Sequence, residues 1–75
     1  MSREVREAKK NAPKASSNML FFIRELQIAR LAILFRLYDS EGAVLNRIKI
    51  SRKIRETERI CYVINKELRK RGLVK

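Results

Sequence analysis

The segment from Met19 to Tyr38 is the longest apolar stretch of the chain, and it limits what the chain can fold into. Five polar side chains interrupt it: Arg24, Glu25, Gln27, Arg30 and Arg36. Charges are costly in the hydrocarbon core of a bilayer, so we do not expect the segment to cross a membrane. A cap at Ser17 or Asn18 and the turn residues 39–42 instead predict a helix over residues 19–38.

The apolar residues of this predicted helix surround its axis instead of forming one stripe. At about 100° per residue, they point to several sides. They are Leu26, Ile28, Leu31, Ile33, Leu34, Phe35 and Leu37. A helix of this kind must be buried on more than one side. We therefore expect a homodimer through helix 19–38, while the alternative is that the rest of a single chain covers it.

The composition of the chain excludes several classes of protein. Its 75 residues form one domain at most, and Cys61 is its only cysteine, so an internal disulfide is excluded. The absence of histidine removes the usual zinc ligands and general base, and no glycine-rich phosphate loop is present. We expect no enzymatic activity, no metal and no cofactor. The N-terminal residues lack an apolar run and carry Glu4 and Glu7, so they do not resemble a secretory signal, and we expect an intracellular protein.

The net charge of +11 is unevenly distributed along the chain. Residues 1–18 hold five basic and two acidic side chains, residues 19–44 hold three of each, and residues 45–75 hold eleven and three. The middle of the chain is thus neutral and apolar, whereas the C-terminal part carries most of the positive field. This distribution predicts a polyanionic partner, with nucleic acid favoured over an anionic membrane surface.

Residues 1–18 contain the only proline and few apolar side chains, so they predict a flexible basic N-terminal arm. The arm either lies along phosphates or in a minor groove, or is a solvated tail. Its basic residues are Arg3, Arg6, Lys9, Lys10 and Lys14.

The C-terminal part predicts two more helices. Residues 44–56 fit both a strand and a helix, and the helix is favoured because a ribbon-helix-helix protein needs two helices after its strand. Thr57 is a candidate cap for a helix over about 57–71, and Gly72 supplies a left-handed stop. The apolar stripe of this last helix consists of Ile60, Cys61, Ile64 and Leu68.

The ending Leu68 to Val74, LRKRGLV, resembles that of the winged helix-turn-helix family of DNA-binding regulators. Ser51, Ile54, Cys61 and Ile64 fall on positions that match the family pattern. The small basic regulators encoded by archaeal viruses and plasmids are the subgroup most similar in length and charge, and the composition is typical of a thermostable protein.

The resemblance implies a mainly α, three-helix winged helix-turn-helix domain over residues 19–75, with a turn at residues 55–57. Arg55 departs from the glycine that this turn often contains. Only three residues follow Gly72 in the sequence, so the wing is expected to be minimal or truncated, with two short strands at most. Leu73 and Val74 are the candidates to pair with residues 43–45.

The expected function is that of a sequence-specific double-stranded DNA-binding protein and transcription regulator. The helix over about 57–71 is expected to lie in the major groove, and a dimer would read half-sites about 34 Å apart. Arginine and asparagine suit base edges, and an aromatic ring can pack on a base or sugar, so the candidate base contacts are Arg59, Tyr62 and Asn65. The candidate phosphate contacts are Lys49, Arg52, Lys53, Arg55, Lys66 and Arg69. The alternatives are an RNA-binding or ribosome-associated module and a non-specific chromatin protein. Any one of the nine candidate contact residues could equally belong to a solvated helix face.

Overall fold

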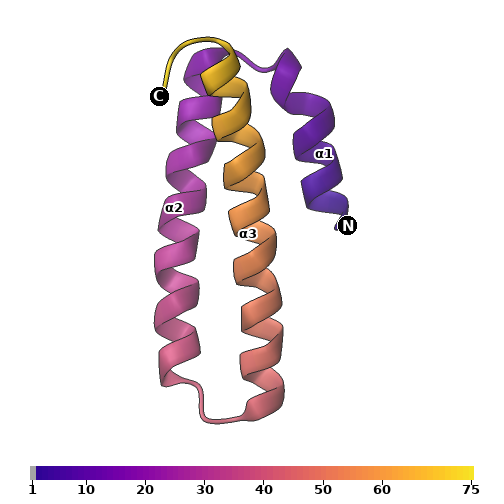
Figure 1. Cartoon of the computed structure of the whole chain (residues 1–75). Helices are drawn as coiled ribbons and strands as arrows, with labels where there is room; N and C mark the ends of the chain where they lie inside the picture. Colours follow the sequence, from indigo (N-terminus) through magenta and orange to yellow (C-terminus); the bar gives the residue numbers. More distant parts are fainter. Residues whose placement is uncertain (1) are drawn as a thin grey trace.

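The computed structural model describes residues 2–75, and the fold is mainly α. Its elements are helix α1 (Arg3–Asn11), a 3-10 turn η1 (Ala12–Lys14), helix α2 (Ser17–Ser40) and helix α3 (Val44–Lys70). Helices α2 and α3 form a long antiparallel hairpin, and α1 lies beside the C-terminal half of α3 (Figure 1). The molecule is elongated, with extents of 42 × 21 × 17 Å. No strand occurs within residues 2–75.

Helix α2 confirms the helix expected over residues 19–38. It begins earlier than expected, because the hydroxyl of Ser16 caps it and accepts a hydrogen bond of 3.1 Å from the amide of Met19. It ends at Ser40, and residues 41–43 connect it to α3. The carboxylate of Glu41 accepts a 2.9 Å hydrogen bond from the amide of Ala43 and orders this connection.

Helix α3 confirms the helical interpretation of residues 44–56 but corrects the turn that was expected after them. The helix runs without a break from Val44 to Lys70, through residues 55–57. The separate helix expected at about 57–71 is therefore the second half of one long helix. The prediction of a helix-turn-helix turn at this position is wrong.

Thr57 has a different role from the cap that the sequence suggested. Its side chain is fully buried, and its hydroxyl donates a 2.7 Å hydrogen bond to the carbonyl oxygen of Lys53 one turn earlier. A threonine inside a helix satisfies its hydroxyl in this way, whereas a capping threonine accepts from an amide further along the chain. The small buried side chain leaves the helix intact.

The glycine stop of α3 is confirmed, and the wing is not. Gly72 has a φ of 75°, its amide donates to the carbonyl of Arg69, and the amide of Leu73 donates to that of Leu68. Leu73 and Val74 cannot pair with residues 43–45, because the two segments lie at opposite ends of the roughly 40 Å long helix α3 (Figure 1). The expected pairing is therefore wrong.

The N-terminal arm expected over residues 1–18 is also corrected, because helix α1 and turn η1 occupy most of it. The hydroxyl of Ser2 caps α1 by accepting from the amide of Val5 at 3.2 Å. Val5 and Ala12 are buried in the same cluster as Ile60 and Ile64 of α3. The small apolar residues of α1 therefore order it by packing on the hairpin.

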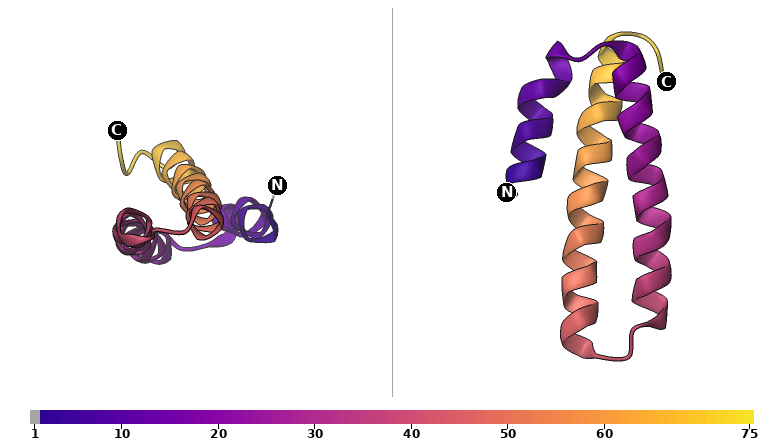
Figure 2. Two further views of the ribbon diagram at one scale, coloured as in Figure 1. Left: turned by 90° about the horizontal axis from the view of Figure 1, so that it is seen from below. Right: turned by 180° about the vertical axis from the view of Figure 1, so that it is seen from behind.

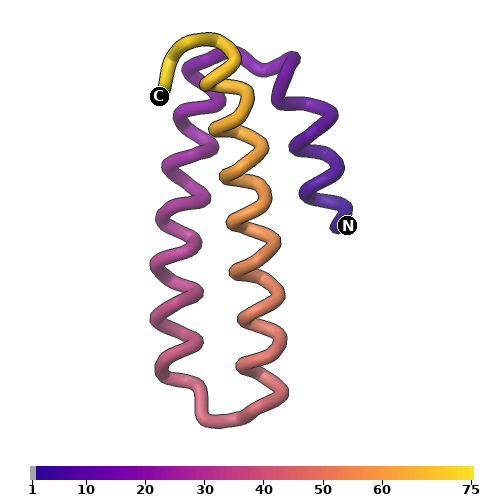
Figure 3. Tube along the Cα trace, viewed as in Figure 1, coloured from indigo at the N-terminus to yellow at the C-terminus, as the bar shows by residue number. Residues whose placement is uncertain are grey.

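Arg71 joins the end of α3 to the linker between α1 and α2. Figure 3 shows residues 71–75 and the linker at the same end of the hairpin. The guanidinium donates to the carbonyl oxygens of Ala12 and Pro13 at 3.2 and 3.3 Å and to the hydroxyl of Ser17 at 3.1 Å. It also pairs with Glu67 at 3.1 Å, and its side chain is mostly buried. One side chain thus holds α1 in place through the linker.

Replacing Arg71 by glutamine is expected to lower the free energy of unfolding by about 2 kcal/mol, because hydrogen bonds from a charged group to partly buried acceptors are lost. Urea denaturation followed by circular dichroism measures the change. Lys70→Gln is the matched control and should change stability by less than about 0.5 kcal/mol, because this neighbour is exposed. Equal effects of the two substitutions would show that Arg71 does not anchor the linker.

The buried core lies in the half of the hairpin that α1 covers. Its members are Val5, Ala12, Leu20, Ile60, Ile64 and Leu68. The view from below in Figure 2 shows α1 and α2 on different sides of α3. Towards the hairpin connection no third helix is present within the described residues, and Ile54 is the buried apolar residue nearest to it. No helix in residues 2–75 has a stretch long and apolar enough to span a bilayer.

Candidate nucleic-acid interface

A row of exposed side chains, mostly cationic, runs along the side of α3 that points away from α2. Its members recur at spacings of three and four residues and so share one side of the helix. They are Arg52, Arg55, Arg59, Tyr62, Lys66 and Lys70, which we name the basic face, and all are exposed. Each of these residues lies two positions from a residue of a buried row defined below as the inward row. Two positions correspond to about 200° around the helix, so the two rows lie on nearly opposite sides of α3. The inward row consists of Ile50, Ile54, Thr57, Cys61, Ile64 and Leu68, all buried or half-buried.

Helix α1 extends the positive charge of the basic face. A shallow groove of about 380 Å³ separates the two helices and is lined by Lys9 of α1 and by Tyr62, Lys66 and Lys70 of α3. The turns of α1 therefore place basic side chains from both ends of the sequence beside one another. Lys9 thus belongs to a helix packed next to the basic face, and not to a flexible arm.

The cations of the basic face are not neutralised by neighbouring acids. Within residues 2–75, the ion pairs are Arg3–Glu7, Arg30–Glu4, Lys53–Glu56 and Arg71–Glu67. None of them involves a member of the basic face. The charge of this surface is therefore available to an anionic partner.

Three residues that the sequence grouped with this surface, Lys49, Lys53 and Asn65, lie away from its centre. Lys49 and Lys53 line a hollow beside Leu34 of α2, which Arg52 borders from the edge of the basic face, and Lys53 pairs with Glu56 at 3.8 Å. Asn65 is half-buried, about 120° around α3 from Arg59, and its side-chain oxygen is buried without a hydrogen-bond partner in the described part of the chain. Arg69 is exposed and lies seven residues after Tyr62, only about 20° from it around α3, so it lies at the edge of the basic face.

The structure brings together six of the nine expected contact residues. They are Arg52, Arg55, Arg59, Tyr62, Lys66 and, at the edge of the face, Arg69. Two further basic residues, Lys9 and Lys70, were not among the expected base or phosphate contacts of the C-terminal helices. Lys70 continues the spacing of three and four residues, which the sequence already contains. The position of Lys9 beside the basic face depends on how α1 packs against α3, so no local sequence pattern predicts it.

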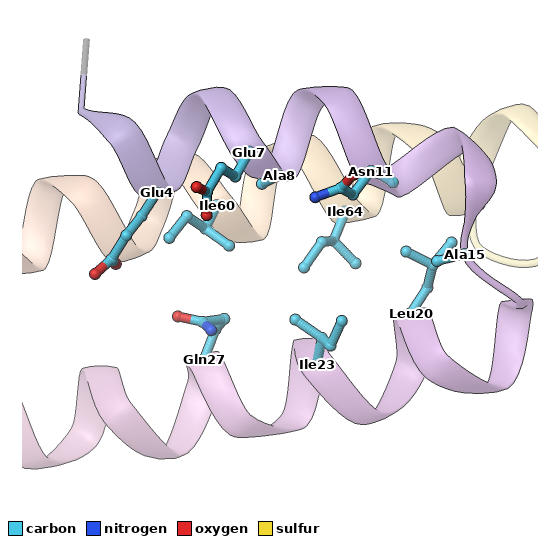
Figure 4. Close-up of a pocket in the computed structure, with 11 residues that line it drawn as sticks. Glu4, Glu7, Ala8, Asn11, Ala15, Leu20, Ile23, Gln27, Ile60 and Ile64 are labelled. Atoms are coloured by element: carbon cyan, nitrogen blue, oxygen red, sulfur yellow. The ribbon is translucent and has the colours of Figure 1, made fainter.

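The opposite side of α1 is acidic and faces α2 across a cavity of about 280 Å³. Figure 4 shows Glu4, Glu7 and Asn11 on one side of the cavity and Gln27 on the other, over an apolar floor. A hydrogen bond with Glu56 and then the nearby Arg30, 3.4 Å away, lower the pKa of Glu4. This side of α1 would repel phosphates, so α1 separates an acidic side from a basic one.

The remaining reactive group, Cys61, belongs to the inward row. It is half-buried and free, and burial raises the pKa of its thiol. A raised pKa keeps the sulfur protonated at neutral pH and therefore weakly nucleophilic. No cluster of three or more potential metal ligands of the types His, Cys, Asp and Glu occurs in the described part of the chain.

Comparison of the chain with protein-family models, with curated proteins and with solved structures gives no match in any of the three. The resemblance to winged helix-turn-helix regulators therefore has no support from relatives.

Proposed function

We propose that the protein binds double-stranded DNA through the basic face, mainly by contacts with phosphates. The observation that carries this proposal is the row of unpaired cations on the side of α3 away from α2, flanked by Lys9. Lysine and arginine side chains that neutralise phosphates release counterions, and this release provides most of the affinity of such surfaces for nucleic acid. The row extends for about 27 Å, from Arg52 to Lys70, which is long enough to follow several phosphates.

The width of the helix pair favours phosphate contacts over deep insertion into a groove. Helix α1 packs against the C-terminal half of α3. Two packed helices with axes about 8–10 Å apart are roughly 20 Å wide, whereas a major groove is about 12 Å wide. The part of α3 that α1 flanks therefore fits across the backbones better than within the groove.

A sequence-specific regulator of transcription is the second candidate. Arg59 and Tyr62 support it because both are exposed near the centre of the basic face, and arginine can bind a guanine edge with two hydrogen bonds. With Asn65 half-buried, Arg59 is the side chain best suited to read a base.

The test compares affinities for three ligands at one salt concentration: duplexes selected from a random pool, the same duplexes with scrambled sequence, and double-stranded RNA of equal length. We expect both DNAs to bind more tightly than RNA. A selected sequence that binds more tightly than its scrambled form supports the regulator. Binding to RNA that equals or exceeds binding to DNA contradicts the proposal.

Substitution of single side chains separates base contacts from phosphate contacts. Replacing Lys66 by alanine is expected to weaken binding to all duplexes equally and to lower the salt dependence by about one phosphate contact. Replacing Arg59 by alanine is expected to cost about 1 to 3 kcal/mol, and to relax preference at one base pair if it reads a base. Lys53→Ala is the control, since this lysine pairs with Glu56 away from the basic face. A loss as large as that of Lys66→Ala would contradict the assignment of the face.

A further inference from the structure

Helix α2 carries a second apolar row that no other element within residues 2–75 covers. Its members are Met19, Phe22, Leu26, Ala29, Ile33 and Leu37, which we name the outer stripe. The five large side chains of this stripe are 49% to 60% exposed. The residues of α2 that face the hairpin form a separate row, which consists of Leu20, Ile23, Gln27, Leu31, Leu34 and Tyr38, all buried or half-buried.

The spacing of the outer stripe is that of a coiled-coil seam. From Met19 to Ile33 the apolar residues alternate at three and four residues, so Met19, Leu26 and Ile33 fall on one heptad position and Phe22 and Ala29 on the other. This regular part of the stripe is about 21 Å long. Such a seam packs against another helix of the same kind, and a contiguous exposed apolar surface marks an interaction site.

Charge identifies the partner of this seam. Residues 17–40 contain three arginines and two acids, a net charge of +1, so the rest of the chain holds +10 of the total of +11. The large net charge outside α2 opposes close approach of two copies, and this opposition is smallest at the nearly neutral α2. In a parallel pair, Glu25 flanks the seam and lies beside Arg30 of the other copy, five residues further along, which is the usual pairing of oppositely charged flanking positions. Arg30 also lies 3.4 Å from Glu4 of its own chain, so it would lie between two carboxylates.

We infer that the outer stripe binds a second copy of the chain in parallel, and that the resulting dimer bridges two DNA segments. The bridging rests on the proposed DNA binding of the basic face. That face points away from α2, with Arg52 at its edge bordering the hollow beside Leu34, because it lies opposite Ile50, which lines that hollow, and opposite the buried Ile54. A dimer formed through α2 therefore carries its two basic faces on opposite outer sides.

This arrangement differs from the one that the sequence predicts for a helix-turn-helix dimer. Two recognition helices on one side of a dimer reach half-sites of a single duplex. Basic faces on opposite sides cannot both contact one straight duplex. Each face binds its own segment, and the dimer holds the two segments together.

The dimer is tested without nucleic acid by sedimentation at micromolar concentration. We expect a dimer for the wild-type chain and a monomer for Leu26→Asp, with unchanged helical content because Leu26 lies on the surface. Leu45→Asp is the control and should remain a dimer, since Leu45 is 74% exposed near the hairpin connection and outside the stripe. A monomeric wild type, or a dimeric Leu26→Asp, overturns the inference.

The direction of pairing is tested by a disulfide cross-link. In a Cys61→Ala background, Met19→Cys should form a covalent dimer on mild oxidation, because parallel helices bring the two copies of residue 19 together. In an antiparallel pair with the same seam, residue 19 of one chain lies opposite Arg36 of the other. The two copies of residue 19 are then about 25 Å apart, and no cross-link forms. The absence of a cross-link in a dimeric protein overturns the parallel arrangement.

Bridging is tested by capture of a labelled duplex on an immobilised one. The wild-type chain should capture it, while Leu26→Asp should capture less than about one tenth as much and still bind single duplexes with an affinity within about twofold. A dimer that binds one duplex but captures no second overturns bridging and leaves the proposed function intact. A dimer that binds no duplex overturns the proposed function, and bridging with it, but leaves the stripe as the dimer interface.

Binding to phosphatidylserine vesicles tests a membrane as the partner of the stripe. If the wild type bound these vesicles more strongly than Leu26→Asp and did not dimerise, the stripe would be a membrane-binding surface, and the inference would be overturned.

Discussion

Replacing Arg55 by proline is expected to destabilise the protein by at least about 3 kcal/mol, because position 55 lies inside the continuous helix α3. A proline there removes the amide that bonds to the carbonyl one turn earlier, and its ring collides with that carbonyl. The total stability of a chain of 75 residues is only about 4 to 11 kcal/mol. Thermal and urea denaturation, followed by circular dichroism, should therefore show a much lower midpoint or an unfolded chain.

Two controls separate the effect on the backbone from other causes. Arg55→Ala removes the same exposed side chain without affecting the helix and should change stability by less than about 0.5 kcal/mol. Val44→Pro places proline at the first position of α3, where the preceding residue Ala43 is extended and proline is tolerated. If Arg55→Pro melted like the wild type, the chain would contain the turn that a helix-turn-helix domain requires.

The continuity of α3 could have been predicted from the apolar pattern. The apolar residues on the two sides of positions 55–57 keep one helical phase, because Ile54 and Cys61 are seven residues, or about two turns, apart, without the change of phase that a turn introduces. The predicted helix start at Thr57 was wrong because threonine occurs both as a helix cap and inside helices, where its hydroxyl donates to a carbonyl one turn earlier. The two roles differ only in the backbone around the hydroxyl.

Helix α1, unlike α3, could not have been predicted from its local sequence. A helix of nine residues is marginal in water by itself, and Val5, Ala8 and Ala12 offer little apolar surface. Its order depends on the hairpin residues Ile60 and Ile64, against which it packs. The helices and their approximate ends were thus predictable for α2 and α3, whereas the order of the N-terminal segment depends on tertiary contacts.

The candidate site was predictable in part for the same reason. The basic character of residues 45–75 is a property of the sequence, but the side of α3 that remains exposed depends on where α2 and α1 lie. Asn65 and Arg59 are both polar and lie on the same helix, yet the packing leaves one half-buried and the other exposed. Choosing between them requires the arrangement of all three helices.

Reversing two charges of the basic face is expected to reduce DNA affinity more than any single substitution. Arg55→Glu combined with Arg59→Glu removes two cations from the centre of the face and places two carboxylates against the phosphates. Each lost arginine contact costs about 1 to 3 kcal/mol, so the pair should weaken binding at least about 30-fold at constant salt. Fluorescence anisotropy with a labelled duplex measures the loss, and both residues are exposed, so the fold should persist.

A matched control must change the net charge equally at another place. Arg36→Glu combined with Lys75→Glu also lowers the charge by four units, but these residues lie away from the basic face: Arg36 is exposed on α2, and Lys75 follows the end of α3. If affinity depends on the local field of the basic face, this control should weaken binding less than about tenfold, and the difference should shrink as salt is raised. Equal losses from the two double variants would show that DNA responds to the total charge of the protein and that the basic face is not the binding surface.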